Sequence, residues 1–588
     1  MTPALRFALP MILVYASGVS LQQAPGRDTV AQRNVGTALV SGTVVHQVSG
    51  QPVRRVSVLL SDSERNLRLA AVTDETGKFA FTDLPDGRYL LSASRPGFVA
   101  VNYGATRPER PGTPIALASG EQRNGVTLRM SPGAVITGTV RNRGGEPVPG
   151  ARVIVLRSAP SYLTGEPSLA PVAGGFIGQV TDDRGEYRAF GLPAGEYYVV
   201  ALASIGTLSG PELRETSAAE VDWATRQLQS PGSAAPPDQG RAVDYVPVFF
   251  PGAFTQASAA TVTVKAGEER AGIDIPLEVV PTGKINGQVV SPAGDLPPTL
   301  QINVIAHDTI PGIPFSGFGT ARADAAGRFV SAGLAPGDYT ITVRVPPGPR
   351  GGGAGTAAIF GLAKVSVSGG DVDATVTLGS GITVAGRLVF AGAGKPPADL
   401  TRVRVNLEAE RSRTPSLGVA AVMADAAGNF QIVGVLPGRY RLSATGAGGW
   451  FVRGATIGGR DSLDVAVEVG DRDVTGAEIT FTDEQTEISG DLLDASGKPA
   501  PEYFIIIYPA DRKYWLPQSR RIQSTRPGND GKYRVQNLPP GDYLIAAVTD
   551  VQQNEWFDPA FLAQLVGAST KVVLAEGEKK VQSLRIKR

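Results

Sequence analysis

The sequence predicts an all-β protein, a tandem array of about five antiparallel β-sandwich modules. Three observations support this prediction. The 588 residues include 72 Gly and 45 Pro, which is typical of a chain with many turns. Two short signatures recur five times in the same order. After the second signature, apolar side chains recur at every second residue, which is the period of a half-buried strand.

The first signature opens each repeating unit and places a Gly between two apolar residues, with one residue on either side of the Gly. Its copies are Val40, Gly42 and Val44; Ile136, Gly138 and Val140; Ile285, Gly287 and Val289; Val384, Gly386 and Leu388; Ile488, Gly490 and Leu492. Successive glycines are 96, 149, 99 and 104 residues apart. The repeat is therefore about 100 residues long, and the second unit carries one long insertion.

The second signature is a Gly followed two residues later by an aromatic residue, and then Gly-x-Tyr. Its copies are Gly77, Phe79, Gly87 and Tyr89; Gly185, Tyr187, Gly195 and Tyr197; Gly327, Phe329, Gly337 and Tyr339; Gly428, Phe430, Gly438 and Tyr440; Gly531, Tyr533, Gly541 and Tyr543. Turn sequences such as Leu84-Pro85-Asp86-Gly87 precede the Tyr. We therefore expect a hairpin, a tight turn and a half-buried strand in each unit.

Other β-branched runs complete the units. We expect internal strands at 56–60, 153–156, 403–407 and 504–508, and closing strands at 126–130, 273–277, 372–378, 477–481 and 581–586. The predicted modules are 35–131, 132–281 with an insertion near 204–240, 282–380, 381–484, and 485–588 with a short C-terminal helix at Asp558 and Pro559. Within the insertion, residues 212–229 are expected to form an amphipathic helix.

Residues 1–24 have the pattern of a secretory signal peptide. Arg6 precedes an apolar run from Phe7 to Ala16, which is much shorter than the ~20 residues that a membrane-spanning helix needs. Cleavage is expected between Ala16 and Ala24. We therefore predict a secreted, periplasmic or cell-surface protein without a membrane span in the mature chain, the alternative being an ordinary N-terminal core helix.

The second unit carries a family resemblance. Its first signature is followed by the turn Gly145-Glu146-Pro147-Val148, by the strand residues Ala151, Val153 and Val155, and then by Thr-Asp-x-x-Gly-x-Tyr and Leu-Pro-x-Gly-x-Tyr. This order resembles the carboxypeptidase regulatory-like domain. The resemblance implies Greek-key sandwiches of the transthyretin-like (prealbumin-like, Ig-like) and carbohydrate-binding-like kind over almost the whole mature chain. The fourth unit departs from the pattern at Val435-Leu436-Pro437-Gly438 and the fifth at Gly528-Asn529-Asp530, in both cases within turns.

The resemblance is to a non-catalytic module attached to some metallocarboxypeptidases, so it implies no peptidase activity. The composition points the same way, because the chain has no Cys and only two His, and neither His46 nor His307 begins a His-x-x-Glu zinc motif. We therefore predict no enzyme activity, no catalytic residue, no metal site and no cofactor. With 56 Lys and Arg against 55 Asp and Glu, nucleic acid is not an expected partner.

Acidic residues leave two alternatives open. Glycoside hydrolysis needs only two suitably spaced carboxylates, and calcium takes oxygen ligands. The candidates Asp182 and Asp183 lie in a recurring turn, where Asp commonly caps its own backbone. No Asp-x-Asp-x-Asp-Gly spacing is present. A structural role for these turn residues is therefore the favoured interpretation.

The four tryptophans all lie in stretches that depart from the repeat. Exposed aromatic faces beside polar groups suit sugar rings, so the predicted ligand-binding residues are Trp223, Trp450, Trp515 and Trp556. The alternative is that these rings seal hydrophobic edges or module junctions. Ligand binding requires at least one of them to face solvent in a cleft.

Together these features predict a non-catalytic, exported, multi-module binding protein of the cell envelope. Carbohydrate is the best ligand prediction, on the analogy of the fold, and the expected partner is a polysaccharide or an envelope protein. The alternative is a structural spacer or adhesive stalk with protein partners. A cryptic glycoside hydrolase is less favoured, and it requires two carboxylates that face one cavity.

Overall fold

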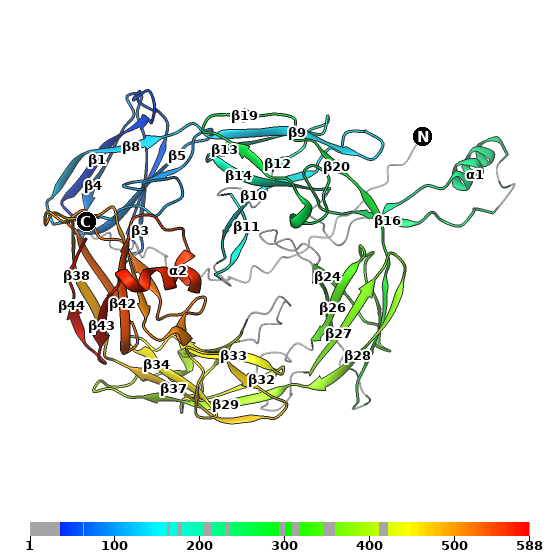
Figure 1. Ribbon diagram of the computed structural model, residues 1–588. Helices are drawn as coiled ribbons and strands as arrows, with labels where there is room; N and C mark the ends of the chain where they lie inside the picture. The colour runs from blue at the N-terminus through cyan, green and yellow to red at the C-terminus, as the bar shows by residue number, and fades with distance from the viewer. Residues whose placement is uncertain are drawn as a thin grey trace, which may run out of the picture.

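The computed structural model describes residues 36–586, except 63, 162–164, 173–178, 204–212, 231, 233–234, 293, 295, 297–299, 308–317, 345–358 and 411–420. The predicted signal peptide therefore lies outside the described residues. The strands fall into five groups in chain order, here called modules 1 to 5. The modules follow one another around a ring, and module 5 lies against module 1 (Figure 1). The predicted all-β fold and tandem β-sandwich modules are confirmed.

Module 1 illustrates the parallel pairing of first and closing strands that all five modules share. Its strands are β1 (Ala38–His46), β2 (Ser57–Asp62), β3 (Leu67–Val72), β4 (Lys78–Leu84), β5 (Gly87–Ser94), β6 (Val101–Asn102), β7 (Ile115–Leu117) and β8 (Gln122–Met130). One sheet has the order β4-β1-β8 and the other β3-β2-β5-β6. Strand β1 is antiparallel to β4 but parallel to β8. Every module repeats this parallel pair between its first and closing strands, which the sequence pattern did not predict.

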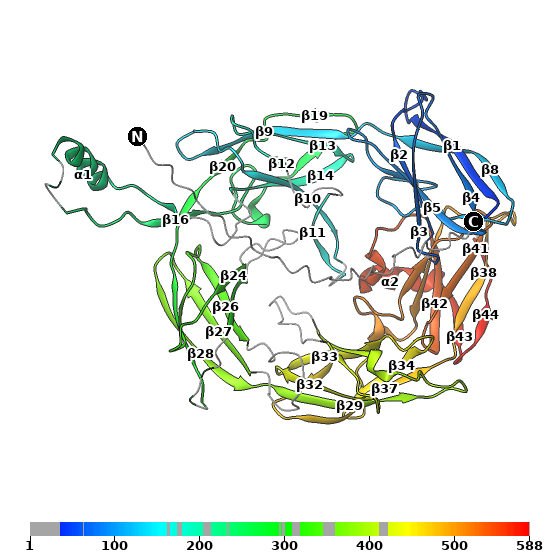
Figure 2. The ribbon, with the colours of Figure 1, turned by 180° about the vertical axis from the view of Figure 1, so that it is seen from behind.

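Module 2 carries the long insertion. Its elements are β9 (Ala134–Asn142), β10 (Arg152–Pro160), β11 (Pro167–Pro171), β12 (Gln179–Val180), β13 (Glu186–Leu192), β14 (Gly195–Leu202), β15 (Leu213–Arg214), α1 (Ala218–Gln229), β16 (Ala242–Tyr245), β17 (Val248–Phe249), η1 (Gln256–Ser258), β18 (Val262–Val264), β19 (Glu269–Arg270), β20 (Ile275–Leu277) and β21 (Val279–Pro281). Strands β15, β16 and β21 form a small separate sheet. The segment with α1 projects outward from the ring as an arm, which both views show (Figures 1 and 2).

Module 3 differs from the others because its strands form one continuous sheet. They are β22 (Ile285–Val290), β23 (Gln301–Ala306), β24 (Phe318–Ala321), β25 (Arg328–Val330), β26 (Gly337–Arg344), β27 (Ile359–Val367) and β28 (Val372–Ser380). The order is β24-β23-β26-β27-β28-β22-β25. The long strand β27 pairs with both β26 and β28 and so joins the two halves.

Modules 4 and 5 return to two sheets each. Module 4 contains β29 (Ile382–Phe390), η2 (Leu400–Arg402), β30 (Arg404–Ala409), β31 (Val422–Met423), β32 (Asn429–Val435), β33 (Gly438–Thr445), β34 (Phe451–Ile457), β35 (Arg460–Asp461), β36 (Val467–Val469) and β37 (Val474–Thr482). Module 5 contains β38 (Glu487–Leu493), β39 (Phe504–Pro509), η3 (Arg512–Tyr514), β40 (Gln523–Thr525), β41 (Lys532–Gln536), β42 (Gly541–Val548), η4 (Glu555–Phe557), α2 (Pro559–Leu565), η5 (Val566–Ala568), β43 (Thr570–Leu574), β44 (Lys579–Val581) and β45 (Leu584–Arg585). The predicted C-terminal helix is confirmed as α2, because Asp558 caps it, Pro559 begins it and Leu562 is fully buried.

The two signatures meet in the core of each module. The bare face of each first-signature glycine lies against the closing strand, the aromatic ring of the second signature, or both. A Cβ atom on Gly386 would lie 2.1 Å from the carbonyl oxygen of Ala477 and 2.5 Å from the ring of Phe430. Where the aromatic residue is Tyr, its hydroxyl donates to the closing strand, as Tyr187 does to the carbonyl of Ile273 at 2.7 Å. The glycine therefore makes room for the Phe ring in modules 1, 3 and 4. In modules 2 and 5 it makes room for the backbone segment to which the Tyr hydroxyl donates.

The tyrosine of the second signature closes the turn before its own strand. In every module its hydroxyl donates to the backbone carbonyl four residues earlier, at 2.6–2.8 Å: Tyr89 to Pro85, Tyr197 to Pro193, Tyr339 to Ala335, Tyr440 to Leu436 and Tyr543 to Pro539. Burial raises the pKa of Tyr197 and of Tyr543 to about 12, so both hydroxyls remain protonated donors at neutral pH. The motif is a structural device rather than a ligand site.

Candidate ligand-binding pocket on the arm

The arm is built by a capped helix between two short strands. Ser217 accepts a hydrogen bond from the backbone N–H of Glu220, whose carboxylate in turn accepts one from the N–H of Ser217, which is a capping box. The helix predicted over residues 212–229 is observed over Ala218–Gln229, and it begins later than predicted because Leu213 and Arg214 form strand β15. None of the helix residues is buried. The helix therefore depends on its cap and on the segment that returns beside it.

Glu220 also ties the base of the arm together. Its carboxylate accepts a second backbone hydrogen bond, from the N–H of Gly240 at 3.2 Å. Hydrogen bonding from Ser217 is the main cause that holds the pKa of Glu220 below its ordinary value. The carboxylate is therefore charged at neutral pH and is already engaged by the backbone.

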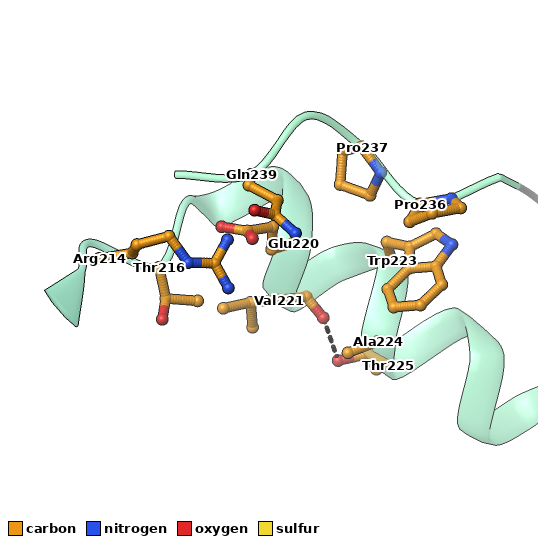
Figure 3. Close-up of a pocket in the computed structure, with 10 residues that line it drawn as sticks. All are labelled: Arg214, Thr216, Glu220, Val221, Trp223, Ala224, Thr225, Pro236, Pro237 and Gln239. Carbon is orange, nitrogen blue, oxygen red and sulfur yellow. Dashed lines mark hydrogen bonds between the residues drawn. The ribbon is translucent and has the colours of Figure 1, made fainter. Parts of the chain in front are cut away.

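A pocket of about 480 Å³ lies between the helix and the returning segment (Figure 3). It is lined by Arg214, Thr216, Glu220, Val221, Trp223, Ala224, Thr225, Pro236, Pro237 and Gln239. The Trp223 ring lies beside Pro236, while the side chains of Arg214 and Gln239 lie toward the other end. The pocket thus has an apolar aromatic end and a polar end, which is the usual composition of a small-ligand site.

Trp223 is the one predicted ligand-binding tryptophan that lines this pocket. It is half-buried and comes from the exposed helix α1. The sequence correctly placed this residue in the insertion. It did not indicate the polar partners Arg214 and Gln239, because Arg214 lies on the short strand β15 and Gln239 lies in a segment without regular structure.

The other three tryptophans belong to the modules. Trp515 and Trp556 are only 5% and 6% exposed, and they lie in a second core of module 5 with Tyr508 and Leu562. The indole N–H of Trp515 donates to the carbonyl of Pro509 at 2.8 Å. The exposed faces that ligand binding requires are therefore absent at Trp515 and Trp556, and this part of the site prediction needs correction.

Trp450 occupies an intermediate position at the edge of module 4. It is half-buried against the core of that module, and its ring meets Phe390 edge-on with ring centres 5.1 Å apart. This contact is that of a ring that seals a hydrophobic edge. Of the four predicted residues, Trp223 therefore retains the surroundings of a ligand site.

The residues considered for catalysis or metal binding have structural contacts. Asp182 accepts hydrogen bonds from the backbone N–H groups of Arg184 and Glu186, at 3.0 and 2.8 Å. His46 accepts backbone N–H groups of its own turn, while His307 bonds to Thr340 in module 3. Within the described part of the chain, no group of three or more His, Asp or Glu residues could hold a metal ion. No described helix is long and apolar enough to cross a membrane.

Comparisons with known proteins bear on the fold. Residues 39–131 match the family model described as the carboxypeptidase regulatory-like domain. The resemblance is therefore confirmed, with its match on module 1. A search of curated proteins finds no match to the chain.

Among solved structures, the chain is similar to several proteins at low identity. They include the Bacillus anthracis TIE protein (9% identity over 77% of this chain and 74% of that chain, TM-score 0.14), the Streptococcal ancillary pilin (12%, 58% and 98%, TM-score 0.21) and two B repeat units of the collagen binding protein of Staphylococcus aureus (10%, 72% and 94%, TM-score 0.14). Because these TM-scores are far below 0.5, nothing about the function of this chain follows from them.

Proposed function

We propose that this protein is a non-catalytic, exported binding protein of the cell envelope, in which the ring of modules is a scaffold and the arm pocket binds carbohydrate. The observation that supports this proposal is the placement of Trp223 in a pocket on an exposed arm. Loops and insertions on a rigid β scaffold commonly carry recognition. The export part of the proposal rests on the signal-peptide pattern of residues 1–24.

The chemistry of the pocket suits a sugar. An indole face offers an apolar platform for the C–H face of a sugar ring. Arg214 and Gln239 offer hydrogen-bond donors, and Gln239 and Thr216 offer acceptors, for the ring hydroxyls. A mono- or disaccharide unit of a longer chain is the expected occupant, because the pocket volume of about 480 Å³ lies within the ordinary range for small-molecule sites.

Two alternatives are less well supported. A glycoside hydrolase needs two carboxylates at its site, whereas Glu220 is the single carboxylate among the ten residues that line the pocket. A spacer or stalk holds its ends apart, whereas modules 1 and 5 of this chain are in contact. An adhesive role with a protein ligand is compatible with a closed ring. The saccharide titration described next separates this role from carbohydrate binding.

Replacing Trp223 by Ala is expected to weaken carbohydrate binding at least ~10-fold, because a central aromatic anchor commonly contributes about 2 kcal/mol. The measurement is tryptophan fluorescence and calorimetry of the full chain, titrated with a panel of soluble oligo- and polysaccharides. Leu228→Ala is the matched control, since Leu228 lies on the same helix, is 87% exposed and does not line the pocket. The absence of saturable binding across the panel, or equal affinities for wild type and Trp223→Ala, would reject the carbohydrate site.

A further inference from the structure

The ring is closed by a contact between modules 1 and 5, here called the seam. It joins residues 64, 88 and 104–116 of module 1 to residues 501, 526–534 and 550 of module 5. The covalent chain runs around the other way through modules 2, 3 and 4. The seam is therefore a non-covalent junction of the ring (Figures 1 and 2), and beside it Gly165 of module 2 also lies close to the backbone of Phe557 in module 5.

Arg526 is the centre of the seam. Its guanidinium donates to the carbonyls of Gly104 and Pro111 in module 1 and, at 2.9 Å, to that of Pro501 in its own module. The residue is only 6% exposed. Burial lowers the pKa of Arg526 to about 10, so the group still carries its charge and all its donors at neutral pH.

Module 1 also contributes an arginine that donates to backbone carbonyls across the seam. Arg88 donates to the carbonyls of Lys532 and Arg526, at 3.1 and 3.3 Å. The amide oxygen of Asn529 accepts from the backbone N–H of Ala116 at 2.9 Å, and the N–H of Asn529 donates to the carbonyl of Pro114. The turn at residues 526–532 of module 5 thus docks on module 1 largely through backbone N–H and carbonyl groups. Because these groups have fixed positions, they align the two modules in one relative position.

Ion pairs surround this centre. Arg110 and Arg107 both meet Asp550, at 2.6 and 3.1 Å, and Arg534 meets Glu64 at 3.0 Å. The side chains of Arg107, Arg534 and Glu64 are each about half or more exposed. Such exposed pairs are screened by salt.

The seam is separable from the folding of the modules. The hydrophobic core clusters of the described residues are each confined to one module, so none spans modules 1 and 5. An interface made of hydrogen bonds and ion pairs, without a shared core, opens more readily than a module unfolds. Opening it exposes two different complementary surfaces at the two ends of one chain.

We propose that the seam is exchangeable, so that module 5 of one copy docks on module 1 of a second copy of this chain through the same contacts. Two unlike surfaces on one chain form a heterologous interface, which closes on itself or joins copies head to tail. Within one chain the covalent path through modules 2, 3 and 4 makes the contact intramolecular, which favours the closed ring at low protein concentration. Contact between copies therefore increases with protein concentration and with any condition that opens the ring.

The test uses fluorescence energy transfer in the full chain, because the sequence has no Cys and thiol-reactive labels therefore attach only at the introduced Cys residues. Thr106→Cys and Gln553→Cys place exposed labels close to the Arg107–Asp550 pair. A chain that carries both labels reports the closed ring, and a mixture of singly labelled chains reports contact between copies. At about 10 nM we expect transfer only within the doubly labelled chain, whereas mixing singly labelled chains at about 200 µM should give transfer at least ~5-fold above background.

Arg526→Ala should reduce both signals at least ~10-fold, since it removes charge-assisted hydrogen bonds from the centre of the interface. Arg526→Lys is the second variant, because an ammonium cannot reach the same carbonyls with a planar fork. Arg534→Ala is the matched control and should change the signals less than about 2-fold, as expected for an exposed pair. Circular dichroism of each variant reports whether the modules remain folded.

The possible outcomes separate the parts of the proposal. Strong transfer within one chain together with background transfer in the concentrated mixture would show that copies do not share the seam. Background transfer within one chain would show that the ring is open. Transfer between copies that survives both Arg526 variants in folded protein would assign the contact to another surface. Each of these three results overturns the proposal.

Discussion

Replacing Gly386 by Ala is expected to destabilise module 4 strongly, whereas Gly454→Ala in the same sheet should be tolerated. A Cβ atom on Gly386 would overlap the carbonyl oxygen of Ala477 at 2.1 Å and the ring of Phe430 at 2.5 Å. The carbonyl belongs to the closing strand, so relief requires a shift of the backbone between β29 and β37. We expect a loss of more than about 3 kcal/mol in the free energy of unfolding, at the upper end of overpacking effects.

Gly454 is the matched control for this prediction. It lies on β34 of the same sheet, and a Cβ atom there would meet no heavy atom within 4 Å. The change in stability at this position should remain within about 1 kcal/mol. Thermal unfolding and limited proteolysis of the full chain report both variants. Equal stability of the two variants would show that the first signature does not depend on close strand approach.

Replacing Asp464 by Ala is expected to destabilise the junction of modules 4 and 5 by about 3–5 kcal/mol, because it leaves partly buried arginines without their shared carboxylate. The side chain of Asp464 is 2% exposed. It accepts hydrogen bonds from the Nε atoms of Arg520 at 2.6 Å and Arg521 at 2.7 Å, both from module 5. The guanidinium of Arg521 also lies over the ring of Tyr514, with its Cζ atom 4.4 Å from the ring centre.

The same carboxylate gives the junction a defined pH dependence. Burial opposes the charge of Asp464, but the hydrogen bonds and charges of Arg520 and Arg521 outweigh it and hold the pKa below its ordinary value of 3.8. A lowered pKa in the folded state means that the stabilisation is fully present above pH ~4–5 and is lost as the pH falls through the folded-state value. The difference between wild type and Asp464→Ala should therefore be large at pH 7 and shrink in acid.

An exposed pair at the same junction provides the control. Arg453 and Glu576 also join modules 4 and 5, at 2.9 Å, but their side chains are 44% and 32% exposed. Glu576→Ala should cost less than about 1 kcal/mol. Chemical denaturation of both variants at pH 7 and pH 3 measures the contrast. A cost for Asp464→Ala no greater than that for Glu576→Ala would contradict a central role of the buried carboxylate.

Much of the module architecture could be predicted because it is encoded locally. The spacing of the two signatures indicated the repeat length, and the alternation after each Tyr indicated the strand. The parallel pair in each module could not be predicted, because the pattern of one strand does not contain the direction of its partner. The same holds for the continuous sheet of module 3, which depends on β27 pairing with two strands at once.

The burial of Trp515 and Trp556 did have a signal in the sequence. Residues 504–508 are apolar or aromatic at every position rather than at alternate positions, which is typical of a strand with both faces covered. In the structure Ile505 and Ile507 face the sandwich core, whereas Phe504 and Ile506 face the second core under α2. Aromatic residues that follow such a strand are therefore expected to pack on its outer face rather than to bind a ligand.

The structure also explains why the turn at Gly528-Asn529-Asp530 departs from the repeated pattern. Four modules cap this turn with an Asp, as Asp74 does in module 1. In module 5 Gly replaces that Asp, and Asn529 reaches Ala116, which is 413 residues away in the chain. The sequence showed that the turn differed, but a contact at that separation leaves no local pattern.

Ring closure is the central claim, and small-angle X-ray scattering from the full chain at low protein concentration tests it most directly. A closed ring predicts a compact distribution of interatomic distances, and Arg526→Ala should extend that distribution by opening the seam. A wild-type distribution as long as five sandwich modules laid end to end, unchanged by Arg526→Ala, would contradict the account.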